Sequence, residues 1–439
     1  MFQKSCLWLL YAALLASPNA WAEETLPPVI SKTMPVAGGS IITLDMAVDK
    51  AVANSSQLKA AQAATDASKG AQSQAGALPN PELGVEADSI AGQGQYSGFK
   101  SAEITYGVSQ LVEIGGKRSA RQAAADQEHA IAHAAYEAAR LDLIRDVKTA
   151  YAEAVAAKES MALAAKQKSL AAEVLVNVTK RVNAAAEPLF QKSKSEVALS
   201  NSEMALDKAQ RDYTIARKRL AALWDSISTD FEPDSSRFFE ISAPAKASIS
   251  EDSLRANPDL VRWNAEVARN EAQLELERAT ALPDPRFNVG VKEFNATNER
   301  AFVVGVSLPI PVFNLNQGNV AKAHGEVTKA VSSKRFAEIN LNAELSRNQQ
   351  ELESAYRQAT ILKTQILPSA ERAFSQSRQG YDAGKFAYLE VLDAQRTLVE
   401  ARAQYNDTLK NYHIKRAEVE RLSATYAPAV EEKDDSHEN

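Results

Sequence analysis

Cysteine is almost missing from this 439-residue sequence, which contains only Cys6, alongside five histidines. This scarcity excludes a disulfide framework and cysteine-based metal motifs. Aromatic residues make up only 7% of the chain, and alanine dominates its apolar residues. The length would suit about three ordinary globular domains. The composition, however, suits long helices better than thick cores.

An excess of positive charge is also missing. The formal net charge is −6, which leaves no basic footprint for a nucleic acid, so we expect no nucleic-acid partner. The sequence shows no nucleophile–base pair and no phosphate loop; the glycines of "IAGQGQYSG" are not followed by a helix. We therefore predict that the protein is not an enzyme and needs no cofactor.

Long apolar runs are absent except at the N-terminus. Lys4, the apolar stretch from Leu7 to Ala16 and the small residues Ala20 and Ala22 predict a signal peptide over residues 1–22, cleaved near Ala22. No run approaches the ~20 apolar residues that a transmembrane helix needs. Since Cys6 leaves with the signal, we expect an exported, cysteine-free protein.

The remaining chain repeats one plan. "ALPNPELGVE" begins at Ala77 and "ALPDPRFNVG" at Ala281, each with a proline pair before an alternating stretch. We predict repeat 1 over residues 43–224 and repeat 2 over residues 251–424, joined by an irregular link over 225–250. An extended segment over 23–42 precedes them, and an acidic, disordered tail over 425–439 follows.

Each repeat opens with a helical pattern of about 30 residues, and Thr43 is the expected N-cap of the first. A proline-free helical pattern then runs from Lys117 to Arg181, roughly 100 Å of helix. Its counterpart from Gly318 to Gly380 contains one expected break, at Pro368. A short turn and a returning helix close each repeat, near Trp224 and Leu422.

Between these helices the apolar period changes from 3.6 to 2, which predicts one β-hairpin per repeat, at about 81–112 and about 285–310. The same alternation fits a half-exposed soluble sheet, and periodicity alone does not separate the two interpretations. Four membrane strands cannot close a barrel, and an open edge in lipid is forbidden. Membrane insertion would therefore require several chains to pool their hairpins, and the long helices would then form a tube.

The chain resembles the TolC-type outer-membrane efflux proteins over nearly its whole mature length, and most of all the outer-membrane components of cobalt–zinc–cadmium and copper–silver efflux systems. The resemblance is carried by "LPNPELGVE", "VSQLVEIGGKR", "LPDPRFNVGV", "VSLPIPVFNLNQGN" and "GYDAGKFAYLEVLDAQRTLVEAR". It implies a mainly α fold with a small β part. Three chains would form a homotrimer with a twelve-stranded outer-membrane barrel and a periplasmic helical tube.

The resemblance also implies partners: a periplasmic adaptor, or membrane fusion protein, and an inner-membrane resistance-nodulation-division pump. Outer-membrane lipid would surround the barrel. In that barrel we expect one set of strand residues to face lipid: Leu83, Val85, Ile104, Val108, Val289, Val304 and Val306. The residues expected to line the lumen are Glu82, Glu86, Glu103 and Lys292.

The resemblance places the periplasmic gate at the two turns between the long helices. Gly384 allows a tight reversal there, and Tyr381 can pack against a neighbouring helix. Glu390 and Asp393 share a helix face and would form rings of carboxylates, although a solvated helix face is the alternative. Ala185 stands where a glycine is expected, which puts the left-handed geometry of the first turn in doubt.

His129 and His133 are four residues apart, within reach of one metal ion on a helix, but they lack a close third ligand. We favour a structural or solvent-exposed pair. The alternative functions are a periplasmic coiled-coil adaptor or scaffold without membrane insertion, and a duct of the same family for organic compounds.

Overall fold

The computed structural model describes residues 40–244 and 256–424. The predicted signal peptide, most of the N-terminal segment, the end of the link and the acidic tail lie outside the described residues. The chain divides into two units, Met1–Ser40 and Ile41–Asn439, and the elements below belong to the second unit apart from Ser40.

Eight α-helices account for most of the described chain, which confirms the prediction of a mainly α fold with a small β part. They are α2 (Leu44–Asn54), α3 (Ser56–Ala75), α4 (Lys117–Asn183), α5 (Leu189–Ala222), α7 (Pro258–Thr280), α8 (Gln317–Ile361), α9 (Leu367–Asp382) and α10 (Tyr388–Leu422). The strands are β1 (Ser40–Ile42), β2 (Glu82–Asp88), β3 (Glu103–Leu111), β4 (Phe231–Pro233), β5 (Arg286–Phe294) and β6 (Glu299–Ser307). Two 3-10 turns, η1 (Gly94–Tyr96) and η2 (Ser236–Phe239), and a π-helical segment, η3 (Leu362–Ile366), complete the elements.

The first opening helix is divided, contrary to the single helix of about 30 residues that we expected. Thr43 caps α2 as predicted, because its hydroxyl accepts a hydrogen bond from the Met46 amide. The chain then turns at Ser55, and α3 starts afresh. The Asp225 carboxylate accepts hydrogen bonds from both the amide and the hydroxyl of Ser56. A distant side chain therefore caps α3 and stabilises the break.

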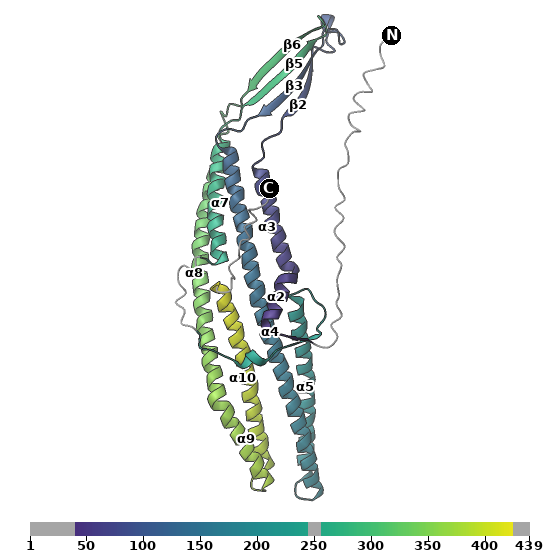
Figure 1. Ribbon diagram of the computed structural model, residues 1–439, viewed down its shortest axis with the longest axis vertical. Coiled ribbons are helices and arrows are strands. Elements are labelled where there is room, and N and C mark those ends of the chain that lie inside the picture. The colour runs from purple at the N-terminus through teal and green to yellow at the C-terminus, as the bar shows by residue number, and fades with distance from the viewer. Residues whose placement is uncertain (1–39, 245–255, 425–439) are drawn as a thin grey trace, which may run out of the picture. The chain divides into compact units, whose positions relative to one another are not determined.

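The long helices follow the proline pattern. α4 runs without interruption for 67 residues. In the second repeat the expected break at Pro368 takes the form of η3, which lies between α8 and α9 without separating them into different directions (Figure 1). Pro368 has no N–H and its ring crowds the preceding turn, and a π-helical turn is a known way to absorb such a defect.

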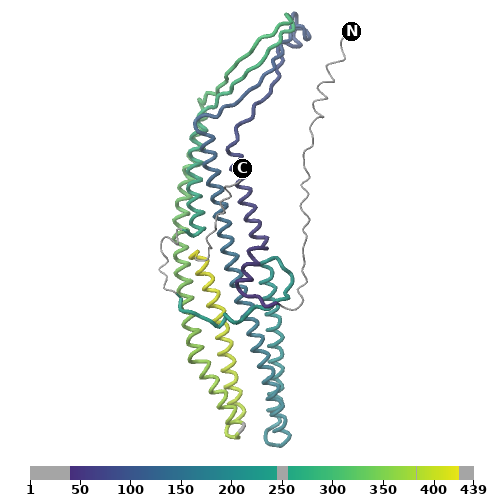
Figure 2. The backbone as a smooth tube through the Cα atoms, viewed as in Figure 1, coloured from purple at the N-terminus to yellow at the C-terminus, as the bar shows by residue number. Residues whose placement is uncertain are grey.

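Helix α4 is central to the packing. Along its length it contacts α3 and α7, and further on α5 and α10, while α8 packs on α7 and α10 (Figures 1 and 2). The largest buried cluster surrounds the middle of α4 and includes Val147, Val155, Leu220 and Leu409. These helices form a row in which α5 and α8 lie at opposite edges.

The link after α5 is more ordered than we predicted. Its strand β4 pairs with β1, and the side chains of Phe231 and Phe238 enter the central cluster. The Tyr151 hydroxyl of α4 hydrogen-bonds to the Ile42 and Asp234 carbonyls. Buried aromatic anchors and satisfied backbone groups thus fix a segment whose composition indicated an irregular connection.

The two expected hairpins, β2–β3 and β5–β6, are present and form one antiparallel sheet in the order β2-β3-β5-β6. Among the described residues, no helix combines the length and the apolar character needed to cross a membrane.

Candidate channel elements

The four-stranded sheet has one apolar face. Its register places Leu83, Val108, Val289 and Val304 in a single row across all four strands. All seven residues that we expected to face lipid lie on this face, because partners in the register share a face and residues two apart along a strand do too. The face also carries Ala87, Tyr106, Phe287, Val291 and Phe302, with Gln110 near one end and the ion pair of Glu293 and Arg300 near the other. Several of these side chains are strongly exposed, with 81% for Leu83 and 78% for Val304.

The opposite face is charged. It carries Glu82, Glu86, Glu103 and Lys292, the four residues that we expected to line the lumen. The Lys292 ammonium contacts Glu103 Oε2 at 2.6 Å and Asp88 Oδ2 at 3.2 Å, and Arg286 pairs with Glu82. Sequence reasoning missed Asp88 and Arg286 as partners, because cross-strand ion pairs depend on the register.

A row of glycines also lies on the charged face. Gly84, Gly107 and Gly290 are neighbours across three strands. A Cβ atom at Gly290 would approach the Tyr106 carbonyl oxygen to 2.6 Å. The backbones therefore come closer at this level than side chains would permit, as at a bend in a curved sheet.

The two turns at the far ends of the long helices have the same geometry. Gly384 has a φ of 69° and Ala185 a φ of 52°. In both turns the amide of the next residue donates a hydrogen bond to the carbonyl five residues before it. These bonds join Ala186 to Arg181 and Lys385 to Gly380. The doubt about Ala185 was therefore wrong. The Schellman bonds hold the left-handed conformation, at a cost of roughly 1–2 kcal/mol for a residue with a Cβ.

Tyr381 connects the two turns. Its hydroxyl donates a 2.9 Å hydrogen bond to Glu187 Oε1, and the Arg181 guanidinium lies 4.6 Å from its ring centroid. Arg181 Nε also lies 3.1 Å from the same carboxylate oxygen. Burial first and then the Glu187 carboxylate raise the pKa of the Tyr381 phenol to about 12. We expected the packing of Tyr381, but its two partners carry no local sequence signal.

An apolar cluster lies beside this contact. Val178 of α4 is fully buried against Tyr388 and Val391 of α10. Glu390 and Asp393 flank Val391 in the sequence, and both are exposed. Within the described part of the chain neither forms a close ion pair, although Asp393 interacts electrostatically with Arg396 on the same helix. Their role as a gate ring stays a prediction.

The histidine pair is not assembled into a site. His129 Nδ1 lies 2.9 Å from the Ser68 hydroxyl, and His133 is exposed. The neighbouring Glu128 pairs instead with Arg269 of α7 at 3.0 Å. No group of three or more potential metal ligands occurs among residues 40–244 and 256–424.

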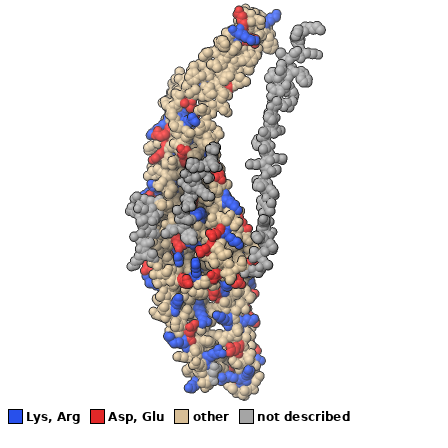
Figure 3. All heavy atoms as spheres, in the orientation of Figure 1, with Lys and Arg blue, Asp and Glu red and all other residues tan. Residues whose placement is uncertain are grey.

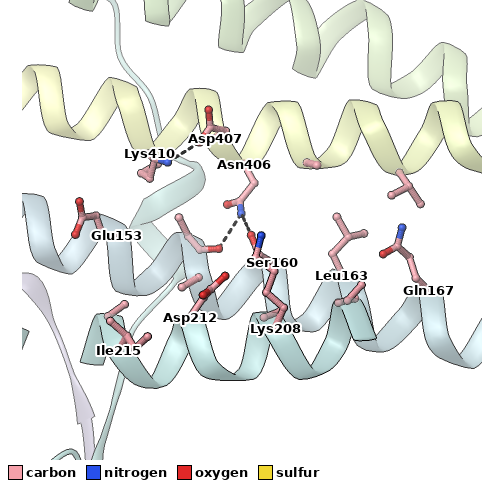
Figure 4. A pocket seen from close by; sticks show the side chains of 18 of the residues that line it. Glu153, Ser160, Leu163, Gln167, Lys208, Asp212, Ile215, Asn406, Asp407 and Lys410 are labelled. Atoms are coloured by element: carbon pink, nitrogen blue, oxygen red, sulfur yellow. Dashed lines mark hydrogen bonds and ion pairs between the residues drawn. The ribbon is translucent and has the colours of Figure 1, made fainter. Parts of the chain in front are cut away.

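A groove with a volume of about 690 Å³ runs over α4 between α5 and α10. Figure 4 shows Asn406 of α10 reaching α4, where its amide donates to the Ser160 hydroxyl and the Ala156 carbonyl, both at 2.8 Å. Charged side chains, among them Lys208 and Asp407, form the rim.

On the face shown in Figure 3, charged residues gather over the helices and are sparse over the strands.

Comparison with known proteins identifies the family. A sequence profile described as "Outer membrane efflux protein" matches residues 47–226 and 249–425. The cobalt-zinc-cadmium resistance protein CzcC of Cupriavidus metallidurans is 30% identical over 90% of this chain and 93% of its own. The nickel and cobalt resistance protein CnrC of the same species is 28% identical over 79% of this chain and 76% of its own.

Solved structures share the fold. A membrane protein from Pseudomonas aeruginosa superimposes with a TM-score of 0.75 at 17% identity, over 87% of this chain and 93% of its own. CusC, a protein studied for transmembrane channel formation, gives a TM-score of 0.73 at 18% identity, over 89% of this chain and 95% of its own. The family profile covers most of the chain, and the chain belongs to the outer membrane efflux protein family.

Proposed function

We propose that this protein is the outer-membrane duct of a tripartite heavy-metal efflux system and that it acts as a homotrimer. It would stand in the outer membrane and extend into the periplasm. The observation that carries the proposal is the sheet, which is apolar on one face and charged on the other and which is joined in sequence to the long helices. The resistance proteins CzcC and CnrC support heavy-metal cations as the cargo.

The dimensions of the sheet suit a bilayer. Strands β3, β5 and β6 each contain 9 residues, and a tilted transmembrane strand needs about 9–11. A soluble periplasmic scaffold would leave the row from Leu83 to Val304 in water, whereas lipid would cover it. The sheet therefore favours the duct over the adaptor alternative.

Free sheet edges support assembly. In the described sheet β2 and β6 each have one neighbour, and unpaired backbone groups are not tolerated in lipid. Pairing β6 of one copy with β2 of the next generates a ring if the rotation closes. Three copies would supply twelve strands, above the ~8 that known membrane barrels need.

The edges of the helical row support the same assembly. On α5, Phe190, Val197 and Met204 are exposed at intervals of seven residues, by 60%, 60% and 63%. On the opposite edge, Ile361 of α8 and Ile366 of η3 are exposed by 45% and 41%. Apolar side chains at heptad spacing are typical of helix–helix seams. A neighbouring copy that pairs its sheet would bring its α8 to this α5.

The tip turns would form the gate. The contact of Tyr381 with Glu187 joins the two helical hairpins at their ends, and Gly384 shapes the turn of the second hairpin. Glu390 and Asp393 would supply three copies of each carboxylate around the opening. Rings of carboxylates favour cations in a narrow pore. A periplasmic adaptor would dock at this end and link the duct to an inner-membrane resistance-nodulation-division pump.

Relatives that export an organic compound support a second candidate cargo. The pyoverdine export protein OpmQ of Pseudomonas putida is 24% identical over 82% of this chain. Deleting the gene and measuring growth in cobalt, zinc, cadmium or nickel separates the candidates. We expect metal sensitivity that the intact gene restores, and the protein in the detergent-requiring outer-membrane fraction. A water-soluble monomer in the periplasm would contradict the duct.

A further inference from the structure

We propose that the segment from Leu308 to Leu315, which we call the strap, is a second membrane-contacting element that lies in the periplasmic leaflet of the bilayer. The inference rests on the proposed function and carries its membrane contact beyond the sheet. The strap connects β6 to α8 at the end of the sheet that is next to the helices (Figure 1). Its large apolar side chains are exposed, with 81% for Ile310 and 94% for Phe313.

The strap continues the apolar stripe of β6. Phe302, Val304 and Val306 follow one another at intervals of two residues, so they lie on one face of the strand. Leu308 and Ile310 keep the same spacing beyond the end of the strand, and both are exposed. The apolar surface of the sheet therefore does not stop where β6 stops.

The strands beside β6 extend in the same direction. The Val112 amide donates a 3.0 Å hydrogen bond to the Pro285 carbonyl, one position beyond the pair of Leu111 with Arg286. Val112 follows Gln110 of the apolar face by two residues, and its side chain is exposed. The apolar face is thus longer than the ladder of paired residues on this side as well.

The stripe within β6 is too short to fill the hydrocarbon layer. Arg300, which pairs with Glu293, ends it at the side far from the helices. From Phe302 to Val306 it measures only about 13 Å at the usual rise per residue, whereas known membrane barrels have an apolar band about 25 Å tall. Counting to Ile310 doubles the length to about 27 Å, or about 20 Å along the membrane normal at the usual strand tilt. The strap therefore supplies much of the missing height.

The backbone of the strap suits an apolar environment. Unpaired N–H groups are costly in lipid, but Pro309 and Pro311 have no N–H. The Val312 amide donates a 2.9 Å hydrogen bond to the Ile310 carbonyl. Few amides of the strap are consequently left to face lipid without a partner.

Both ends of the strap are fixed. Ser307, just before it, pairs with Arg286 in the sheet. Asn316, just after it, donates from its side-chain amide to the Glu277 carbonyl of α7 at 2.8 Å and to Glu277 Oε2 at 2.7 Å. Girdles of aromatic residues flank the apolar band of membrane barrels, and Phe313 lies at the border between strands and helices where such a girdle is expected.

A second copy of the chain is the competing occupant of this surface. If β6 pairs with β2 of the next copy, the strap runs beside residues 77–81 of that copy, which precede β2. That stretch, "ALPNP", offers one large apolar side chain, Leu78. One leucine does not cover the exposed apolar side chains of the strap, whereas lipid that already covers the sheet does.

Depth-dependent fluorescence quenching tests the strap in the trimer folded into phosphatidylcholine vesicles. In a Cys6→Ser background, one environment-sensitive fluorophore is attached at Ile310→Cys, Phe313→Cys, Val304→Cys or Val176→Cys. Lipids that carry a nitroxide on the headgroup or on the acyl chain then quench each label according to its depth. Val304 reports the interior of the bilayer, and Val176 of α4, which is 53% exposed, is the matched apolar control in water.

We expect acyl-chain nitroxides to quench the labels at positions 304 and 310 severalfold and headgroup nitroxides to quench the label at position 313. The label at position 176 should not respond. Quenching at position 304 without quenching at positions 310 and 313 would overturn the strap and leave the duct in place. An unquenched label at position 304 would instead count against the proposed duct, and the strap would fall with it.

A charge in the strap separates lipid from a second copy as its occupant. Ile310→Arg should lower the yield of protein folded into vesicles severalfold, because cations on a lipid-facing surface destabilise membrane barrels. Native mass measurement in detergent should still show a trimer. Val176→Arg is the matched control and should change neither the yield nor the trimer. Loss of the trimer in Ile310→Arg would place the strap between copies and overturn its contact with lipid.

Discussion

Val108 and Val289 lie directly opposite one another in the register of β3 and β5, although they belong to separate hairpins of separate repeats. Their pairing merges two local hairpins into one sheet and continues the apolar row from Leu83 to Val304. This row makes the lipid-facing assignment testable.

Placing arginine in the apolar row should destabilise the membrane-inserted protein. We expect Val304→Arg to cost about 2–4 kcal/mol, the usual penalty for a cation that faces lipid near the bilayer midplane. Folding into lipid vesicles, followed by denaturant titration, measures this cost. Glu86→Arg on the charged face is the matched control and should change stability much less. Equal costs at the two positions would indicate that the apolar face does not contact lipid.

The sequence predicted the two faces of the sheet because a strand has a period of two, so alternation alone separates Val289 from Lys292. It could not predict that β3 pairs with β5, because nothing in the strands specifies a partner so distant in the chain. Two further contacts could not be predicted for the same reason, because each joins residues of separate elements. They are the contact of Tyr381 with Glu187 and the capping of Ser56 by Asp225. At Ala185 the sequence misled in another way. Left-handed residues are usually glycine, but the hydrogen bonds of this turn hold an alanine in that conformation.

Substitutions at the left-handed residues Gly384 and Ala185 should change the stability of the two tip turns in opposite directions. Gly384→Ala adds a Cβ to a left-handed residue and should weaken the turn by about 1 kcal/mol, while Ala185→Gly should relieve strain of similar size. Hydrogen exchange of the Lys385 and Ala186 amides reports each change, and 1 kcal/mol corresponds to roughly fivefold in rate. Both substitutions shifting exchange in the same direction would contradict the shared geometry.

The contact of Tyr381 should be lost only in strong alkali. The folded pKa of about 12 exceeds the ordinary value of about 10, so the protonated phenol stabilises the folded tip. That contribution is complete below about pH 10 and disappears as the pH rises toward 12. The difference in tyrosinate absorbance between the wild type and Tyr381→Phe isolates this residue. Glu187→Gln should lower its pKa, and an unchanged titration would argue against the contact.

Arg421 should be essential for stability where α4, α7 and α10 meet. The Arg421 side chain is only 9% exposed, and its guanidinium pairs with Asp142 and Asp259. Arg421→Ala removes the cation from Asp259 and leaves Asp142 with Arg145 alone, and we expect a loss of about 3–5 kcal/mol. Arg396→Ala breaks the exposed pair with Glu400 and should cost no more than about 1 kcal/mol. Thermal unfolding of the two variants compares these costs, and similar midpoints would contradict the structural role of Arg421.

Three copies of the chain should form a duct whose periplasmic opening is ringed by Glu390 and Asp393. The combined negative charge of these carboxylates should attract cations, so the closed wild-type channel should pass small currents with a preference for cations. Substituting both residues by lysine should weaken or reverse that preference without disturbing the trimer. The direct measurement is the reversal potential of the purified trimer in a planar bilayer under a salt gradient. We expect a cation-selective potential that shifts toward anions in the double lysine variant. A double variant that keeps the wild-type potential would contradict the carboxylate ring.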